Sequence, residues 1–134
     1  MTKSVYINLP IANLKASMAF YTALGFKNNP QFTDDNAACM VYSEFIYVML
    51  HNHGSWRRFT DRPIPASNAS EVMLALSVDS KQAVDELNAI VTANGGTADI
   101  NPKQDLGFMY SRAFTDLDGH IWEPFWMDSA AIPK

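Results

Sequence analysis

The amino-acid sequence contains the same local pattern twice. Residues Val5–Gly25 read VYINLPIANLKASMAFYTALG, and residues Val72–Gly96 read VMLALSVDSKQAVDELNAIVTANGG. Each stretch has a short apolar segment, a polar residue, an amphipathic segment and glycine. The apolar segments align at an offset of 67 residues, which is half of the 134-residue chain. A repeat of this length predicts two similar modules, each of which needs further strands to bury its apolar face.

Each repeat predicts one helix. In the first, Asn13 can cap the free amide groups at the helix start, and Gly25 can adopt the left-handed conformation after its end. In the second, the helix begins at Asp79 or Ser80 and ends at the Gly95–Gly96 pair. Apolar residues at helical spacing predict the buried stripes: Leu14, Met18 and Tyr21 in the first helix, and Val84, Leu87 and Val91 in the second.

The remainder of each half predicts three further strands. Residues Ala37–Leu50 and Arg112–Met127 both have the pattern of a hairpin and align at an offset of 75, which pairs Val48 with Glu123. Extended segments near 27–32 and 97–101 supply one strand more in each half. The predicted fold is therefore α+β, with two tandem βαβββ modules that form a curved mixed sheet and carry their helices on the outer face. The concave inner face of such a sheet is a natural small-molecule site.

We expect one domain over residues 1–134, with module 1 at about 1–53, a linker at about 54–69 and module 2 at about 70–128. A hydrophobic content of 48% favours a packed core. The net charge of −4 and the lack of a basic run longer than Arg57-Arg58 argue against nucleic acid or a membrane as partner. The first residues contain no apolar signal region and Cys39 is the single cysteine, so we expect a cytoplasmic protein.

Two motifs resemble a known group of proteins. MAFYTALGF (18–26) and FTDLDGHIWE (114–123), within the paired halves, are similar to the vicinal oxygen chelate superfamily, which includes glyoxalase I, bleomycin- and fosfomycin-resistance proteins and extradiol dioxygenases. Within it, the chain looks most like small bacterial proteins described as predicted lactoylglutathione lyases. The resemblance implies a single glyoxalase-like domain and a homodimer. It also implies a divalent metal held by one residue from the first strand and one from the last strand of each module.

The repeat places those four ligand positions at Tyr6, Met73, Val48 and Glu123. Valine has no donor atom, and the methionine thioether is a poor match for hard divalent ions. Tyrosine would have to lose its phenolic proton. We therefore expect either no cofactor or a weakly held divalent metal.

Several residues are candidates for the site. Glu123 is the candidate catalytic acid or base; the alternative is a structural carboxylate paired with Arg112. His51 and His53 could join Glu123 in a rebuilt metal site; the simpler interpretation makes them histidines of an exposed turn. The segment 51–70 is either a lid over the pocket or a connector. The candidate ligand-binding residues are Tyr6, Asn8, Val48, Met73, Ser77, Trp56, Phe108, Tyr110 and Arg112.

Three functions are consistent with these residues. The first is a glyoxalase/bleomycin-resistance-like protein that binds a small organic molecule, with an anion among the options, and acts as a lyase or isomerase with an incomplete metal-ligand set. The second is a metal-dependent glyoxalase or dioxygenase that uses Glu123 with His51 or His53. The third is a protein that sequesters a drug or metabolite without catalysis.

Overall fold

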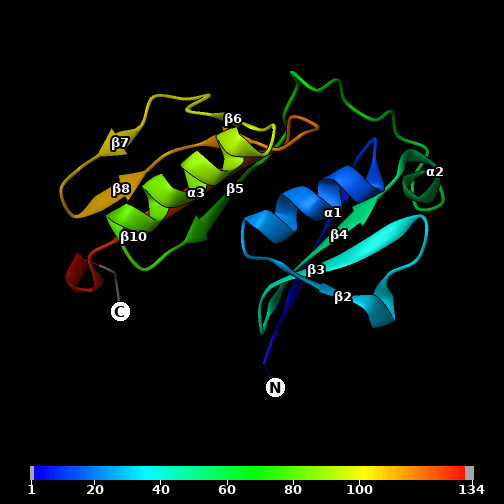
Figure 1. Ribbon diagram of the computed structural model, residues 1–134, viewed down its shortest axis with the longest axis horizontal. Helices are drawn as coiled ribbons and strands as arrows, with labels where there is room; N and C mark the ends of the chain where they lie inside the picture. The colour runs from blue at the N-terminus through cyan, green and yellow to red at the C-terminus, as the bar shows by residue number, and fades with distance from the viewer. Residues whose placement is uncertain (1, 132–134) are drawn as a thin grey trace. The chain divides into compact units, whose positions relative to one another are not determined.

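The computed structural model describes residues 2–131 and confirms the α+β class (Figure 1). The chain divides into two compact units, with the boundary between Ala66 and Ser67. Within these residues the strands form two mixed sheets, one of four strands and one of six. No helix among residues 2–131 combines the length and apolar character needed to span a membrane.

The first unit contains a four-stranded sheet in the order β1-β4-β3-β2. Strand β1 runs parallel to β4, and the other neighbours are antiparallel. Helix α1 packs against β3 and β4, and Figure 1 shows it lying across the sheet. The elements are β1 Val5–Pro10, α1 Leu14–Ala23, β2 Lys27–Asn29, a short 3-10 helix at Pro30–Phe32, β3 Ala37–Ser43, β4 Ile46–His51 and α2 His53–Trp56.

The second unit repeats this topology around β10. Strand β10 is parallel to β5 on one side and antiparallel to β8 and β9 on the other. Strands β8 and β9 pair with β10 in one continuous register, so together they correspond to β3. The elements are β5 Met73–Ser77, α3 Lys81–Ala93, β6 Thr97–Ala98, β7 Gln104–Asp105, β8 Met109–Ser111, β9 Phe114–Thr115, β10 Ile121–Met127 and a 3-10 helix at Ser129–Ala131. The prediction of two βαβββ modules is confirmed.

The helix signals in the sequence are confirmed at most positions. The Asn13 side chain accepts a hydrogen bond from the Ala16 amide at 3.0 Å, and Gly25 has φ +100°. In the second helix the cap is Ser80, whose hydroxyl accepts from the Ala83 amide at 3.0 Å. Val84 and Val91 are fully buried as expected, whereas α1 buries Ser17, Phe20 and Tyr21 more deeply than Leu14 and Met18.

The Asp-x-Asp-Gly segment forms a tight turn in front of β10. The Asp116 carboxylate accepts hydrogen bonds from the amides of Asp118 and His120, at 3.0 and 2.9 Å. Gly119 has φ +89°, and a Cβ atom built there would lie 1.9 Å from the Ser67 carbonyl oxygen. The turn therefore requires glycine both for its backbone conformation and for the close approach of another chain segment.

The predicted match between Val48 and Glu123 is wrong by one residue. Tyr6 pairs with Tyr47 in the first unit, and Met73, its repeat equivalent, pairs with Ile121 in the second. Counting along the strands, Val48 corresponds to Trp122, and both are 0% exposed on the helix-covered side of their sheets. The equivalent of Glu123 is Met49. The strand pairing gives an offset of 74 in place of the expected 75.

Candidate functional site

The face of each sheet that lies opposite its long helix is called here the open face. In the second unit, alternation along β10 directs Trp122 and Pro124 toward α3, where both are buried. Glu123 therefore points to the open face, as expected from the sequence. The open-face residues of the two central strands are Met73, Ala75 and Ser77 of β5, and Ile121, Glu123 and Phe125 of β10.

Glu123 has small neighbours on both adjacent strands. Ala75 pairs with it directly in β5. On the other side, the ladders through Ser111–Phe125 and Phe114–Trp122 share one register, which puts Ala113 opposite Glu123. The Glu123 side chain is half-buried and has no hydrogen-bond or ion-pair partner within residues 67–131. The two neighbours of Glu123 in the sheet therefore contribute only methyl groups.

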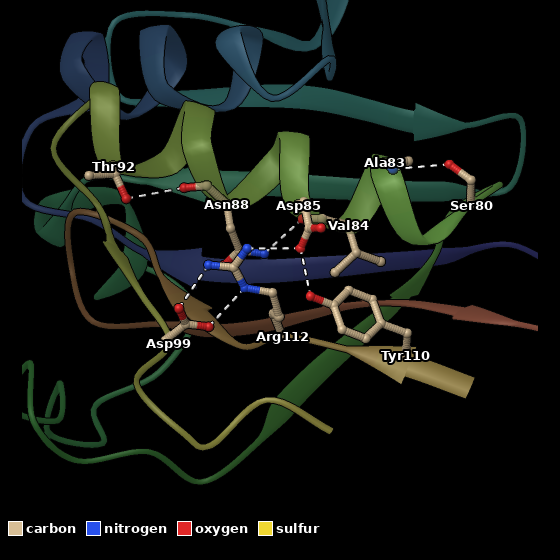
Figure 2. A network of polar contacts seen from close by, with 9 residues as sticks. All are labelled: Ser80, Ala83, Val84, Asp85, Asn88, Thr92, Asp99, Tyr110 and Arg112. Atoms are coloured by element: carbon tan, nitrogen blue, oxygen red, sulfur yellow. Dashed lines mark hydrogen bonds and ion pairs between the residues drawn. The ribbon is translucent and has the colours of Figure 1, made fainter. Parts of the chain in front are cut away.

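Arg112 does not pair with Glu123 but with two aspartates on the other side of the sheet (Figure 2). Its guanidinium donates to Asp99 through Nε and Nη2, at 2.9 and 2.8 Å, and to Asp85 of α3 through Nη1, at 2.9 Å. The Tyr110 hydroxyl donates to the same Asp85 oxygen at 2.7 Å. This set of four residues, called here the Arg112 cluster, links α3 to β8 and to the segment after β6.

Electrostatics in the Arg112 cluster favour the charged forms of Arg112, Asp85 and Asp99 and the neutral form of Tyr110. Hydrogen bonds from Tyr110 and Arg112 hold the pKa of Asp85 below its ordinary value, and the bonds from Arg112 do the same for Asp99. The two carboxylates in turn raise the pKa of Arg112, and Asp85 raises the pKa of Tyr110. These hydrogen bonds and ion pairs within the Arg112 cluster account for its four residues by a structural role.

The position of this cluster places two of the candidate ligand-binding residues away from the open face. Tyr110 pairs with Trp126, whose ring lies 5.5 Å from the Lys81 ammonium at the start of α3. The Arg112 amide donates to the carbonyl of Pro124, a residue buried on the helix side. Tyr110 and Arg112 therefore belong to the helix-covered side of the sheet, and neither lines the open face.

On strands β1 and β4, the open face of the first unit carries aromatic and polar residues without formal charge, and the charged Lys27 lies on the same face of the edge strand β2. The rings of Tyr6 and Tyr47 stack at 4.4 Å between centroids with an interplanar angle of 9°. Asn8 lies two residues along β1 and pairs with Met49. Val48 faces the opposite way and is fully buried, so it does not lie on the open face, and its contact with a ligand stays an untested prediction.

His51 is not a residue of an exposed turn. It is the last residue of β4 and only 4% exposed. Its Nδ1 lies 2.8 Å from the Ser55 hydroxyl and its Nε2 lies 2.8 Å from Asn8 Oδ1. Burial lowers the pKa of His51, and the charge of Asp34 opposes that effect.

The beginning of the predicted linker packs on His51. The Trp56 and Phe59 rings lie 6.3 and 5.3 Å from the His51 ring, both edge-on. Phe59 is nevertheless 75% exposed, and Trp56 is half-buried. Sequence reasoning missed Ser55: His51 ends β4 and Ser55 lies in α2 after the Asn52 cap, so no spacing within a single element predicts their contact. The lid and connector interpretations of this segment both stay predictions.

The remaining candidates are distributed over the two units. Met73, 62% exposed, and Ser77 lie on the open face of β5. Phe108, 47% exposed, lies in the turn between β7 and β8. His53 is the first residue of α2. Residues 2–131 contain no group of three His, Cys, Asp or Glu side chains arranged to hold a metal ion.

The donor set does not fit the divalent metal that the resemblance implies. With the corrected register, the four positions are Tyr6 and Met49 in the first unit and Met73 and Glu123 in the second, and their side chains offer one carboxylate, two thioethers and a phenol. Hard divalent ions prefer several oxygen or imidazole ligands. Both ring nitrogens of His51 are already hydrogen-bonded.

Comparison with known proteins agrees with this fold. A family model described as Glyoxalase/Bleomycin resistance protein/Dioxygenase superfamily matches residues 3–123. The structure of hypothetical protein SA1046 from S. aureus is similar, with 27% identity and a TM-score of 0.79 over 94% of each chain. A search of curated proteins gives no significant match.

Two further solved structures share the fold at lower identity. A glyoxalase/bleomycin resistance protein/dioxygenase family enzyme from Burkholderia phytofirmans PsJN is 18% identical, with a TM-score of 0.77 over 94% of this chain and 99% of that one. The fosfomycin resistance protein FosX from Listeria monocytogenes is 17% identical, with a TM-score of 0.68 over 94% and 93%. The repeated modules, the turn before β10 and the match over residues 3–123 together show that the chain belongs to the Glyoxalase/Bleomycin resistance protein/Dioxygenase superfamily.

Proposed function

We propose that the chain binds a small organic molecule on the open face of its second unit, with Glu123 accepting a hydrogen bond or a proton from that molecule. The observation that carries this proposal is the Glu123 carboxylate itself, half-buried, without a partner in its unit and placed between Ala75 and Ala113. An ionised carboxylate only accepts hydrogen bonds. The ligand therefore carries a hydroxyl, an N–H or an acidic C–H at this point.

The residues around Glu123 favour a ligand with an apolar skeleton. Ile121 and Phe125 lie on the same side of β10, and Met73 offers an adaptable thioether side chain on β5. If the ligand presents an acidic C–H to the carboxylate, Glu123 acts as a general base, which is the requirement of a lyase or isomerase step. The glyoxalase and resistance functions in the names of structural relatives are consistent with small-molecule chemistry of this kind.

The binding test is a thermal-shift screen with small hydroxy, carbonyl and amino compounds. A ligand that binds only the folded state raises the melting temperature. Replacing Glu123 by glutamine keeps the shape but removes the charge, so we expect the affinity of a hit to fall about 10- to 100-fold, the effect of one charge-assisted hydrogen bond. Glu71→Gln, in an exposed segment before β5, is the matched control. Equal affinities of the two variants would contradict the role of Glu123.

We also propose that no metal is tightly held. The supporting observation is the donor set, which offers one carboxylate among four positions. Elemental analysis of protein purified without added metal should find much less than one equivalent of Ni, Zn, Fe or Mn. A full equivalent of one of these metals in the wild type, lost in Glu123→Gln, would support the metal-dependent alternative instead.

Assembly and location stay predictions. The family resemblance predicts a homodimer, which light scattering on a size-exclusion column tests directly. A cytoplasmic location is the expectation from the sequence, and fractionation of cells that express the tagged chain tests it.

A further inference from the structure

Three polar side chains in the first unit form a continuous chain of hydrogen bonds. Ser55 comes from α2, His51 from the end of β4 and Asn8 from β1. Both contacts to the imidazole are 2.8 Å long. His51 is 4% and Ser55 6% exposed, whereas Asn8 is exposed on the open face. The chain, called here the Ser55 relay, therefore leads from the interior to a side chain that a ligand can reach.

The donor or acceptor character of each atom determines which way the hydrogen bonds of the Ser55 relay run. A neutral imidazole has one donor nitrogen and one acceptor nitrogen. Asn8 Oδ1 can only accept, so Nε2 of His51 carries the hydrogen and Nδ1 accepts from the Ser55 hydroxyl. Burial of the ring, the largest influence on its pKa, favours this neutral form at neutral pH. The tautomer of His51 and the orientation of the Asn8 amide are thus coupled.

With its oxygen held by His51, Asn8 exposes its amino group. The Nδ2 atom lies 3.5 Å from the carbonyl oxygen of Tyr6, a long contact that leaves hydrogen-bonding capacity unused. The adjacent open-face residues are the stacked Tyr6 and Tyr47 rings and Met49. These three neighbouring side chains are uncharged, and the cation on this face, Lys27, lies on the edge strand β2, two strands from β4, so the immediate surroundings of Asn8 favour a neutral group over an anion.

We propose that the Ser55 relay locks the Asn8 amide with its N–H groups outward, making the first unit a hydrogen-bond-donor site for the neutral carbonyl oxygen of an aromatic molecule. Asn8 contacts the ligand, and His51 and Ser55 are positioning residues. The proposal rests on the proposed function in one respect, that the open faces bind small molecules. It adds the polarity and the chemical class of the group recognised in the first unit.

The first experiment needs no ligand. Long-range ¹H–¹⁵N NMR spectra of the labelled protein at pH 7 distinguish the two neutral tautomers of His51 and the charged ring. We expect the Nε2–H tautomer. The Nδ1–H tautomer would reverse the Asn8 amide so that its oxygen faces outward, and a charged ring would donate from both nitrogens, so that Ser55 would no longer select the tautomer. Either result overturns the proposal.

The second experiment uses two probes of nearly equal shape, acetophenone and α-methylstyrene, which differ in having C=O or C=CH₂. The readout is the side-chain NH₂ signal of Asn8, assigned by its loss in Asn8→Leu. Acetophenone should shift this signal, and α-methylstyrene should not. In His51→Phe, which keeps a ring but has no donor, the affinity for acetophenone should fall about 5-fold, the effect of one neutral hydrogen bond. His51→Gln, which keeps a hydrogen-bond donor, should restore part of the affinity for acetophenone.

Equal responses to both probes, no response to acetophenone, or an unchanged affinity in His51→Phe would each overturn the proposal. If His51→Phe does not fold, the tautomer and the probe pair still decide the matter in the wild-type protein. The proposed function fails separately, through Glu123→Gln in the second unit. A response at Asn8 with no effect of Glu123→Gln refutes only the role of Glu123, and the reverse result refutes only the Ser55 relay.

Discussion

Two neighbouring residues of β4 should respond in opposite ways to a new carboxylate. Val48 is 0% exposed and faces the side of the sheet covered by α1. Met49 is half-buried on the open face, where it pairs with Asn8 and Cys39. We therefore expect Val48→Glu to destabilise the fold strongly and Met49→Glu to be tolerated.

The magnitude for Val48→Glu has two parts. Loss of the buried valine side chain costs about 2 kcal/mol. The new carboxyl group has no buried partner and must be protonated, and protonating a group of ordinary pKa at pH 7 costs about 4 kcal/mol. The sum, about 6 kcal/mol, is comparable with the whole stability of many domains. Met49→Glu keeps a hydrated charge and should cost about 1 kcal/mol or less.

Urea unfolding, followed by tryptophan fluorescence at pH 7 and pH 4.5, measures both effects. A buried carboxyl has a raised pKa in the folded state, so the stability of Val48→Glu should be higher at pH 4.5 and fall as the pH rises through the ordinary value for glutamate. Val48→Ala is the control, with a loss of about 2 kcal/mol and no such pH dependence. Similar losses for Val48→Glu and Met49→Glu would refute the corrected register.

Three further predictions follow from single sites. Arg112→Met removes three charge-assisted hydrogen bonds, but Asp85 and Asp99 can be rehydrated because their side chains are 53% and 46% exposed, so we expect a loss of about 1–3 kcal/mol in urea unfolding at pH 7. Since both aspartates have lowered pKa values, this contribution is present above pH 3.8 and disappears as the pH falls further, so the wild type and Arg112→Met should converge in acid. Cys39 is 1% exposed and burial raises its pKa, so an aromatic disulfide reagent should react slowly in the native protein and rapidly in urea; rapid native reaction would contradict its burial. Gly119→Ala should lower the melting temperature by many degrees, since φ is +89° and the new Cβ atom meets a backbone oxygen; a shift of only 1–2 °C, small for a clash of this kind, would count against the turn geometry.

Local patterns in the sequence were sufficient for much of this fold. The cap at Asn13 and the left-handed position at Gly25 depend on residues next to one another in the chain. The direction of Glu123 followed from alternation with Trp122 and Pro124, which is a property of any strand. The duplication could be recognised because it repeats such local signals.

The tertiary structure alone decided the register of the first module and the partners of the polar side chains. A shift of one residue moves every side chain of a strand to the other face, and the local sequence did not distinguish Val48 from Met49 as the equivalent of Glu123. The contact of His51 with Asn8 spans 43 residues, and that of Arg112 with Asp85 spans 27. Hydrogen bonds between distant segments form only once the sheet and helices have brought them together, so no local pattern encodes them.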